Sequence, residues 1–364
     1  MLAVGRGRWG TVDRDSTQGA LASIGLVTWL VTGGAGYIGA HVVRALQGSG
    51  RTCVIVDDLS TGVASRVPVD VPLVLGDIHD GPMLQAVMRD HHVDGVVHLA
   101  AKKSPTESMA DPLLYYRENV GGLESVLSSM VRAGVTRIVL SSSSSVYGVP
   151  SSELVDEDAP LAAINPYGMT KAVCELMARD CAAAYGIAAT ILRYFNVAGA
   201  GGISLGDVGV FNLIPLALRA VTRGERPAVF GTDFPTPDGS GVRDYIHVTD
   251  LAEVHALAAA RLESVIAGVG QRSPDVYNVG RGEGVSVLEV LAMVRSVTGH
   301  DLPPLRSARR AGDPPSVVGD TSKITRELGW QARHDLRQMV ESAWESWRVT
   351  HMKAPGSELT PSDP

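Results

Sequence analysis

The sequence is poor in cysteine, in aromatic residues and in excess positive charge. Three of its 364 residues are cysteine and 5% are aromatic, and 39 Asp and Glu against 32 Lys and Arg give a net charge of −7. This balance argues against binding to nucleic acid or to an anionic membrane, because both attract clustered basic residues. An odd cysteine count without metal-ligand spacing predicts no metal site and indicates a reducing compartment, so we expect a cytoplasmic protein.

Two of the cysteines, Cys174 and Cys181, belong to the same predicted helix. Seven residues of helix separate two Cα atoms by about 10 Å along the axis. A disulfide needs a much shorter separation. We therefore expect both to be buried free thiols.

Long stretches without charge are scarce, but residues 16–40 form one and follow three arginines, as in a signal peptide or a membrane span. The glycines within the stretch suit a span poorly, and cleavage would remove a strand that the next motif needs. We expect no membrane segment. Residues 1–27 are expected to be an N-terminal extension without fixed structure, and residues 351–364, rich in Pro and Ser, a disordered tail.

The chain is organised around residues 28–46. An apolar run ending in Val31 predicts a buried strand, the spacing Gly33-x-x-Gly36-x-x-Gly39 predicts a tight turn, and Ala40–Leu46 has the apolar spacing of a helix. Glycines let a backbone approach a pyrophosphate closely, and free N–H groups at a helix start bind the anion. Strand, glycine turn and helix together predict a dinucleotide-binding site rather than an ordinary loop.

Further strands alternate with helices along the first half of the chain. Such alternation predicts an α/β fold with a doubly wound parallel sheet. The helices are expected to include residues 81–90 and a long helix from Asp111, its N-cap, to about Ala133. The strands are expected at residues 51–57, 71–76, 93–101 and 137–140.

Asp57 ends the second predicted strand, where dinucleotide-binding sheets place a ribose-binding carboxylate. Hydrogen bonds from both ribose hydroxyls would favour NAD, because a 2′-phosphate would meet a like charge. The alternative is an aspartate that only forms a turn.

Five serines, Ser141 to Ser145, follow the fifth strand. They are either a flexible linker or ligand-facing residues at the carboxyl edge of the sheet. In an extended chain Ser141 and Ser143 would point the same way.

Tyr167 and Lys171 lie four residues apart in a helix whose start is marked by Asn165 and Pro166, so they share one face. An adjacent ammonium stabilises a phenolate, so we expect the pKa of Tyr167 to fall below its usual value near 10. A tyrosine of this kind can take a proton from an alcohol while hydride leaves the same carbon. The pair alone arises often by chance, but its place after a glycine turn and a strand-end serine supports a catalytic role.

These blocks resemble the extended short-chain dehydrogenase/reductase family and, within it, the UDP-glucose 4-epimerases. The similarity runs from residue 28 to residue 347. It is carried by residues 32–39, 141–148, 167–171, 193–196, 238–250 and 309–313, of which Gly-Val-Arg-Asp-Tyr-Ile-His within 238–250 is the most discriminating.

The resemblance implies a Rossmann-type NAD-binding domain at residues 28–195 and a smaller mixed α/β substrate-binding lobe, mainly residues 196–350, interleaved with it. The implied reaction inverts C4 of a UDP-hexose through a transient 4-keto sugar. The implied assembly is a homodimer through the helices that start near Asp111 and Asn165. The implied catalytic residues are Tyr167, Lys171 and Ser143. The implied NAD contacts are Gly33, Gly36, Tyr37, Ile38, Gly39, Asp57, Asp77, Ile78, Ala100, Ala101, Lys103, Asn119, Ser141, Tyr167, Lys171 and Tyr194. The implied substrate contacts are Ser143, Tyr167, Asn196, Asn212, Leu213, Phe230, Arg243, Arg310 and Asp313.

Ser144 and Ser145 stand where the family commonly has Ala and Thr, and where related 4,6-dehydratases have an Asp-Glu pair, so dehydration is not expected. Val317 stands where some relatives have a bulky residue that crowds the sugar 2-substituent, which leaves UDP-N-acetylglucosamine open as a substrate. UDP-pentoses and UDP-hexuronates stay open too, as does a net NAD-dependent dehydrogenase.

Overall fold

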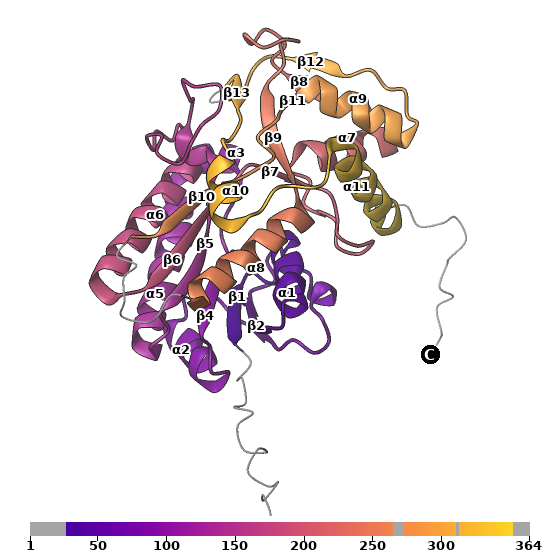
Figure 1. Ribbon diagram of the computed structural model, residues 1–364. Helices are drawn as coiled ribbons and strands as arrows, with labels where there is room; N and C mark the ends of the chain where they lie inside the picture. Colours follow the sequence, from indigo (N-terminus) through magenta and orange to yellow (C-terminus); the bar gives the residue numbers. More distant parts are fainter. Residues whose placement is uncertain (1–26, 265–272, 311–312, 352–364) are drawn as a thin grey trace, which may run out of the picture.

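The computed structural model describes residues 27–264, 273–310 and 313–351 (Figure 1). The predicted extension at 1–27 lies outside these residues except for Val27, and the predicted tail at 351–364 lies outside them except for His351. His351 is not tail but the last residue of a helix, and its ring stacks on that of Trp347 at 3.8 Å. Across the described ranges, no helix is long and apolar enough to cross a membrane.

The larger part of the fold is a parallel sheet of seven strands in the order β10-β6-β5-β4-β1-β2-β3. Both faces are buried, so successive residues pack into different cores: Trp29 and Val31 into one, Leu30 into the other. The fold class predicted from the sequence is confirmed. The strands are β1 (Thr28–Thr32), β2 (Thr52–Asp57), β3 (Leu73–Leu75), β4 (Gly95–His98), β5 (Arg137–Ser143), β6 (Ala188–Tyr194) and β10 (Asp275–Val279).

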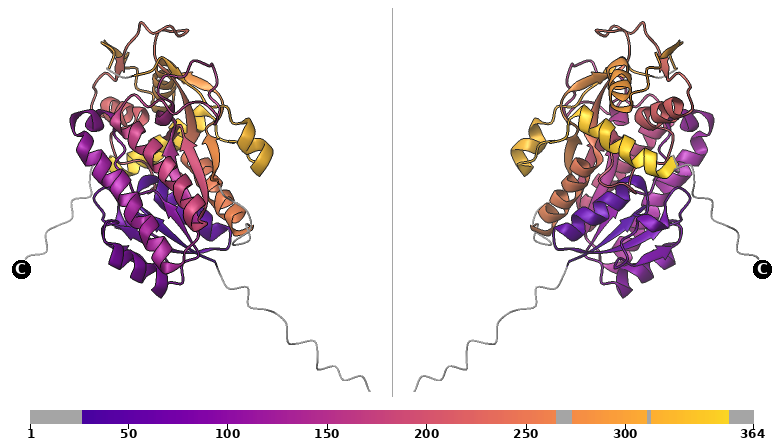
Figure 2. Two further views of the ribbon diagram at one scale, coloured as in Figure 1. Left: turned by 90° about the vertical axis from the view of Figure 1, so that its left-hand side faces the viewer. Right: turned by 90° about the vertical axis from the view of Figure 1, so that its right-hand side faces the viewer.

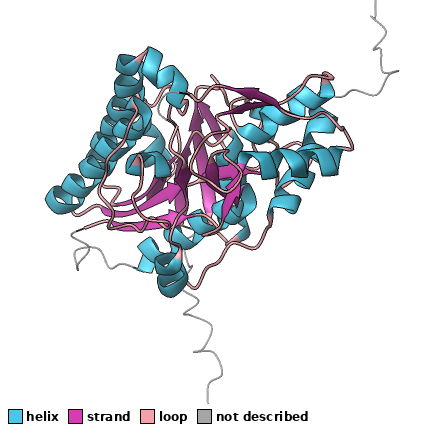
Figure 3. Ribbon diagram, turned by 90° about the horizontal axis from the view of Figure 1, so that it is seen from above, coloured by secondary structure: helices cyan, strands magenta, loops and turns pink. Residues whose placement is uncertain are grey.

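Helices cover both faces of this sheet, as the view from above shows (Figure 3). One face carries α1 (Tyr37–Gly48), α8 (Val248–Ser264) and α10 (Ser322–Leu328). The other carries α2 (Gly81–Asp90), α5 (Gly122–Ala133) and α6 (Pro166–Tyr185). Strand β10 and helix α8 come from the second half of the chain, so the two halves are interwoven.

A second, smaller layer lies beyond the carboxyl ends of the large sheet (Figure 2). Its core joins three helices, α7 (Leu213–Thr222), α9 (Val287–Thr298) and α11 (Leu336–His351). Strand β9 (Val242–His247) pairs with β7 (Asn196–Ala198), β11 (Gly284–Ser286) and β13 (Ser316–Val317), while β8 (Ala228–Phe230) pairs with β12 (Leu305–Ser307).

Local signals located most helix starts correctly. Asp111 accepts from the N–H of Leu114, and Asn165 from that of Gly168, as N-caps do. The predicted helix from Asp111 to Ala133 exists but is interrupted. Its segments are α4 (Pro112–Tyr115), the π-helical turn η2 (Tyr116–Gly121) and α5, after the short helix α3 (Pro105–Ala110).

Strand bounds and the burial of one thiol needed correction here. The strands expected at residues 71–76 and 93–101 are shorter, at Leu73–Leu75 and Gly95–His98. Strand β5 continues through Ser143, and the serines after it form a 3-10 turn, η3 (Ser144–Tyr147), so they are not a linker. Cys174 is a buried free thiol as expected, but Cys181 is only half-buried, since it lies near the outer end of α6. A second 3-10 turn, η1 (Ala64–Arg66), follows β2.

Candidate active site

The glycine turn between β1 and α1 leaves no room for side chains. Gly33 has a left-handed φ of 72°, and a Cβ there would lie 2.9 Å from the backbone N of Ala100. A Cβ on Gly39 would lie 2.1 Å from the carbonyl O of Gly33. Gly36 caps α1 without a side-chain hydrogen bond, so the first N–H groups of α1 are available to an anion. This is the geometry a pyrophosphate needs.

The first residues of α1 contribute backbone rather than side chain. The Tyr37 hydroxyl donates to the carbonyl O of Gly199 at 2.6 Å, and the ring is buried. Ile38 is half-buried. What Tyr37 offers a ligand is therefore its N–H group.

Asp57 lies at the end of β2, beside the glycine turn. Its Oδ2 accepts from the N–H of Ala35 and its Oδ1 from that of Leu59, both at 2.9 Å. Burial raises the pKa of the Asp57 carboxyl, and these two N–H donors lower it. Asp57 thus forms a turn and braces the glycine loop, and its remaining lone pairs are free for ribose hydroxyls.

Asp77 and Ile78 follow β3. The Asp77 carboxylate is exposed and accepts from the N–H and ring Nδ1 of His79 at 2.9 and 2.8 Å, bonds that hold its pKa below the usual value. Ile78 is half-buried. Both lie on the side of the turn occupied by Asp57, because β3 pairs with β2.

The loop after β4 carries Ala100 and Ala101, both half-buried, and the exposed Lys103. Asn119 in η2 braces this loop. Its Oδ1 accepts from the N–H of Lys102 at 2.8 Å, and its Nδ2 donates to the Lys102 carbonyl at 3.1 Å and to Thr170 Oγ1 at 3.0 Å. Only a lone pair of Oδ1 is left for a ligand.

The three predicted catalytic residues meet where β5 ends and α6 begins. Lys171 is buried, and its Nζ donates to the carbonyl O of Ser141 at 3.0 Å and to Ser141 Oγ at 3.2 Å. Ser143 Oγ accepts from the N–H of Ser145 and donates to Ser145 Oγ, both at 3.2 Å. The neighbouring Ser143 side chain lowers the pKa of the Tyr167 phenol.

The prediction that the pKa of Tyr167 falls below its usual value is wrong for the protein without bound ligands, where this pKa is raised. Burial of the phenol raises its pKa and outweighs the lowering effect of Ser143. The Lys171 ammonium points to Ser141, so it does not compensate, and burial lowers its own pKa. The spacing of four residues correctly placed Tyr167 and Lys171 on one helix face. It did not show that the Lys171 ammonium would donate to Ser141.

A buried ion pair beneath the site was missed in the sequence. Glu175 lies one turn after Lys171 and pairs with Arg193, with Nη2 to Oε2 at 2.7 Å and Nε to Oε1 at 3.0 Å. Ser142, between Ser141 and Ser143, donates to Glu175. The pair therefore ties β5, β6 and α6 together. The signal was the spacing of four from Lys171, which puts Glu175 on the same helix face.

Two of the predicted substrate residues form a close pair in the smaller layer: the Arg310 guanidinium lies 3.7 Å from the centre of the Phe230 ring. Burial lowers the pKa of the half-buried Arg243, and the charge of the exposed Asp313 opposes this shift. Cations of this kind suit diphosphate oxygens, and a flat aromatic ring suits a base.

The remaining three predicted substrate residues, Asn196, Asn212 and Leu213, lie on two other segments of the smaller layer. Asn196 is exposed at the start of β7, paired with β9 two residues beyond Arg243. Asn212 is exposed before α7 and donates to Asp207 Oδ2 at 2.8 Å, and Leu213 beside it is half-buried.

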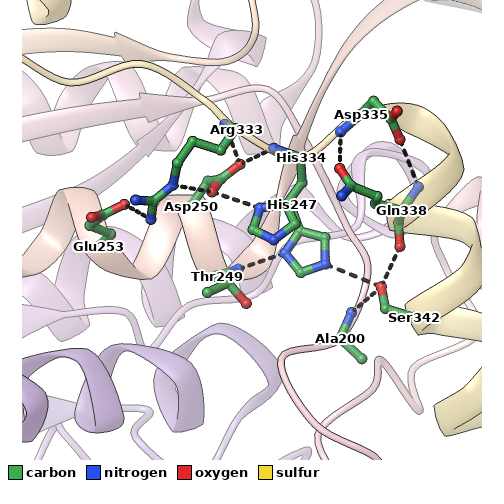
Figure 4. A network of polar contacts seen from close by, with 10 residues as sticks. All are labelled: Ala200, His247, Thr249, Asp250, Glu253, Arg333, His334, Asp335, Gln338 and Ser342. Carbon is green, nitrogen blue, oxygen red and sulfur yellow. Dashed lines mark hydrogen bonds and ion pairs between the residues drawn. The ribbon is translucent and has the colours of Figure 1, made fainter.

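A polar network fastens the approach to α11 onto α8 (Figure 4). Asp250 is fully buried, and its Oδ2 accepts from the N–H groups of Arg333 and His334, both at 3.0 Å. Its Oδ1 lies 2.8 Å from Nδ1 of His334, whose ring stacks on His247 at 4.2 Å. His247 Nε2 reaches Ser342 Oγ on α11 at 3.1 Å. Sequence spacing gave no sign of this network, since its members are far apart in the chain.

Across the described residues, no group of three or more His, Cys, Asp or Glu is placed to hold a metal ion.

Known proteins match both the sequence and the fold. A UDP-glucose 4-epimerase from Azospirillum brasilense is 45% identical over 344 residues, 92% of this chain and 97% of that protein. The enzyme of the same name from Bacillus subtilis is 41% identical, over 89% of this chain and 97% of its own.

Solved structures agree. A UDP-glucose 4-epimerase from Stenotrophomonas maltophila with bound NAD and formylated UDP-arabinopyranose has a TM-score of 0.84 at 41% identity, covering 89% of this chain and 98% of its own. The UDP-Glc/GlcNAc 4-epimerase of Campylobacter jejuni has a TM-score of 0.77 at 33% identity, covering 89% and 99%. The model of the NAD dependent epimerase/dehydratase family matches residues 29–280, and the chain belongs to that family.

Proposed function

We propose that this protein inverts C4 of UDP-glucose and UDP-galactose, with NAD as its resident cofactor and a 4-keto sugar as the transient product. The observation that carries the proposal is the meeting of Ser143, Tyr167 and Lys171 at a sheet edge beside a glycine turn that a Cβ would fill. Relatives named UDP-glucose 4-epimerase, one of them with NAD bound, support the same reaction.

The residues at the turn fit NAD. Gly33, Gly36 and Gly39 leave space and free N–H groups for the pyrophosphate, and Asp57 offers carboxylate lone pairs to the adenosine ribose. We assign the neighbouring contacts to Tyr37, Ile38, Asp77, Ile78, Ala100, Ala101, Lys103, Asn119, Ser141, Tyr167, Lys171 and Tyr194. When bound, NAD supplies the hydride acceptor and donor for C4 of the sugar.

Tyr167 acts as the base that removes the proton of the sugar 4-hydroxyl and later returns it. Ser143 lies against the phenol and bridges it to that hydroxyl. Lys171 is the cation that we assign to favour phenolate, a role that requires its ammonium to lie nearer the phenol than in this structure, where it donates to Ser141. Since burial raises the pKa of Tyr167, the phenolate needs this charge to form at neutral pH.

Inversion requires the hexose to turn while the nucleotide stays bound, so the smaller layer should hold the UDP part firmly. Its cations and amides suit that task. We assign this anchoring to Asn196, Asn212, Leu213, Phe230, Arg243, Arg310 and Asp313.

A Tyr167→Phe variant tests the proposal directly. Loss of the base should lower kcat by about 100 to 10,000-fold, because this is the usual contribution of a positioned acid-base group. Tyr185→Phe, at the exposed C-terminal end of the same helix, is the matched control and should keep full activity. Interconversion of UDP-glucose and UDP-galactose is followed by chromatography. Undiminished turnover in Tyr167→Phe would refute the mechanism, and steady NADH release would indicate a net dehydrogenase instead.

Val317 favours a second candidate activity, the epimerisation of UDP-N-acetylhexoses. This small buried residue in β13 lies opposite Arg243 of β9, beside the assigned diphosphate anchor, and a valine there fills less volume than a bulky residue would. The Campylobacter jejuni relative is a UDP-Glc/GlcNAc 4-epimerase. We expect measurable turnover of UDP-N-acetylglucosamine and its loss in Val317→Tyr, with UDP-glucose turnover kept; UDP-pentoses and UDP-hexuronates complete the panel.

We also propose a homodimer through α4, η2 and α6. These elements expose Leu113, Tyr116, Met169 and Leu176, whose side chains are 77%, 39%, 38% and 48% exposed. Apolar residues gathered on neighbouring helices are typical of a protein interface. Sedimentation should show a dimer that Leu176→Glu weakens, and a monomeric wild type would refute this. The cytoplasm is the proposed location, supported by three cysteines that are all free.

A further inference from the structure

The ring of Tyr167, the proposed base, packs against a second tyrosine. The centre of the Tyr115 ring lies 6.3 Å from that of Tyr167, and the two planes meet at 83°, an edge-to-face contact. Aromatic pairs attract each other at this distance and angle. Tyr115 is fully buried at the end of α4, whereas Tyr167 is half-buried. Tyr115 therefore belongs to the packed side of Tyr167, and the open side is left for a ligand.

The Tyr115 ring is itself held at both ends. Its Cα belongs to α4, while its hydroxyl donates to Glu107 Oε2 on α3 at 2.7 Å and accepts from the N–H of Ser104 at 2.8 Å. A ring tied to two segments in this way keeps one orientation. Burial and the neighbouring Glu107 raise the pKa of the Tyr115 phenol. Tyr115 thus keeps its proton and does not compete with Tyr167 as the base.

The turn of chain after Tyr115 holds the backbone of Tyr167. Asn119 in η2 donates to Thr170 Oγ1 at 3.0 Å, and this hydroxyl donates to the carbonyl O of Tyr167 at 2.8 Å. Asn119 also accepts from the N–H of Lys102 at 2.8 Å, in the loop after β4. Helical segments with π-type bonding, such as η2, are frequent at functional sites. One short segment therefore braces both the ring and the helical turn of Tyr167.

The orientation of this ring matters for the proposed reaction. A tyrosine side chain turns about two bonds, and its hydroxyl is the atom farthest from them, so a small rotation moves the hydroxyl most. Proton transfer needs that oxygen within about 2.6–3.2 Å of its partner. A misplacement of about 1 Å can lower the rate about 100-fold. A neighbour that fixes the ring therefore acts on kcat.

We propose that Tyr115 is a positioning residue for Tyr167, whose ring it holds in the orientation that proton transfer requires. The inference rests on the proposed role of Tyr167 as the base. It gives Tyr115 no contact with the sugar or with NAD. The contact is made by the ring of Tyr115 and not by its hydroxyl, so phenylalanine should replace Tyr115 far better than an aliphatic residue.

Two variants test the role of the ring. Tyr115→Leu should lower kcat for UDP-galactose by about 10- to 100-fold, because the phenol of Tyr167 loses its fixed orientation. The KM should stay within about two-fold of wild type, since the residues assigned to the nucleotide lie in the smaller layer. Tyr115→Phe keeps the ring contact and should recover most of the lost kcat. Equal losses in the two variants would overturn the proposal.

Tyr277→Leu is the matched control. Tyr277 is also fully buried and also donates to a glutamate, Glu327 Oε2, at 2.9 Å, but it lies on β10. Thermal melts should show a loss of stability similar to that of Tyr115→Leu, and kcat should stay at the wild-type value at temperatures where both variants are folded. An equal fall in kcat in Tyr277→Leu would show a general effect of losing a buried ring and would overturn the proposal.

A double variant shows whether Tyr115 acts through Tyr167. Tyr167→Phe keeps the ring but has no hydroxyl to position, so adding Tyr115→Leu should lower its residual activity by less than about two-fold. Long incubations with product chromatography measure that residual activity. A residue that only supports the fold would lower activity by the same factor in both backgrounds. That result would overturn the positioning role.

The same variants separate this inference from the proposed function. Full activity in Tyr167→Phe would refute the proposed function. Loss of activity in Tyr167→Phe together with a wild-type kcat in Tyr115→Leu would refute only the role of Tyr115. If Tyr115→Leu does not fold, Tyr115→Met takes its place with the same expected result, since a flexible unbranched side chain fills the space without holding a ring.

Discussion

Adding one methyl group at Gly39 should cost the protein its cofactor. A Cβ there would lie 2.1 Å from the carbonyl O of Gly33, while real Cβ atoms essentially never approach closer than 3.0 Å, so the turn and α1 must separate by about 0.9 Å, the difference of the two distances. Gly33 donates to Val56 O at 2.9 Å and accepts from the N–H of Gly36 at 3.1 Å. A displacement of that size takes such bonds past hydrogen-bonding distance.

Each buried bond lost costs about 1–3 kcal/mol. Because the turn that moves is the proposed pyrophosphate site, we expect the Kd of Gly39→Ala for NAD to rise at least about ten-fold, the equivalent of about 1.4 kcal/mol. Calorimetry with NAD on apoprotein measures Kd, and the nucleotide content of freshly purified protein gives a second reading.

Gly48→Ala is the control, since it places the same methyl group in the same helix. A Cβ there meets nothing within 4 Å. The Gly48→Ala variant should therefore bind NAD with wild-type affinity. Its free energy of unfolding should rise by a few tenths to about 1 kcal/mol. Equal NAD affinity in the two variants would refute the steric argument.

Three other results are expected. Glu175→Gln should lower the free energy of unfolding in urea by about 3–5 kcal/mol, because it leaves the buried Arg193 without a countercharge; a loss below about 1 kcal/mol would show that the pair is not needed. Asp250→Asn should cost about 1–3 kcal/mol, since the N–H groups of Arg333 and His334 lose a charged acceptor, whereas Glu253→Gln, in an exposed ion pair, should cost less than about 1 kcal/mol in the same assay; equal losses would contradict the network. The free energy of unfolding should fall as pH drops from about 6.5 to about 4. Four buried histidines have a lower pKa in the folded than in the unfolded chain, so the unfolded chain binds protons first, which costs up to about 3 kcal/mol for each histidine. Thermal melts unchanged between pH 7 and pH 4.5 would contradict this. These histidines are His41, His247 and His255, with pKa values of about 4, and His98, with a pKa of about 3.

Features encoded within one turn of chain could be predicted. The cap at Asp111, the cap at Asn165 and the helix at residues 81–90 depend on neighbours a few positions away, and all were confirmed. Strand ends were less certain. Serine has no strong preference for strands, so the extension of β5 to Ser143 depends on pairing with β6, which the local sequence does not show.

The site was only partly predictable, for the same reason. Spacing put Tyr167 and Lys171 on one face, and the confirmed family supports NAD. The partner of Lys171, and hence the pKa of Tyr167, depends on a serine 30 positions away in the chain. The brace formed by Asn119 and the network around Asp250 likewise join segments that only the folded chain brings together. The assigned contacts of the smaller layer stay predictions.

The placement of β10 has a consequence for how the chain is made. Residues 28–195 emerge from the ribosome with six of the seven strands, but the edge of β6 then exposes backbone that β10 later covers. Helix α8, which covers much of one face, also comes later. A fragment that stops near residue 195 should therefore aggregate or be degraded, and the nascent chain should become resistant to protease only after residue 279 has been synthesised.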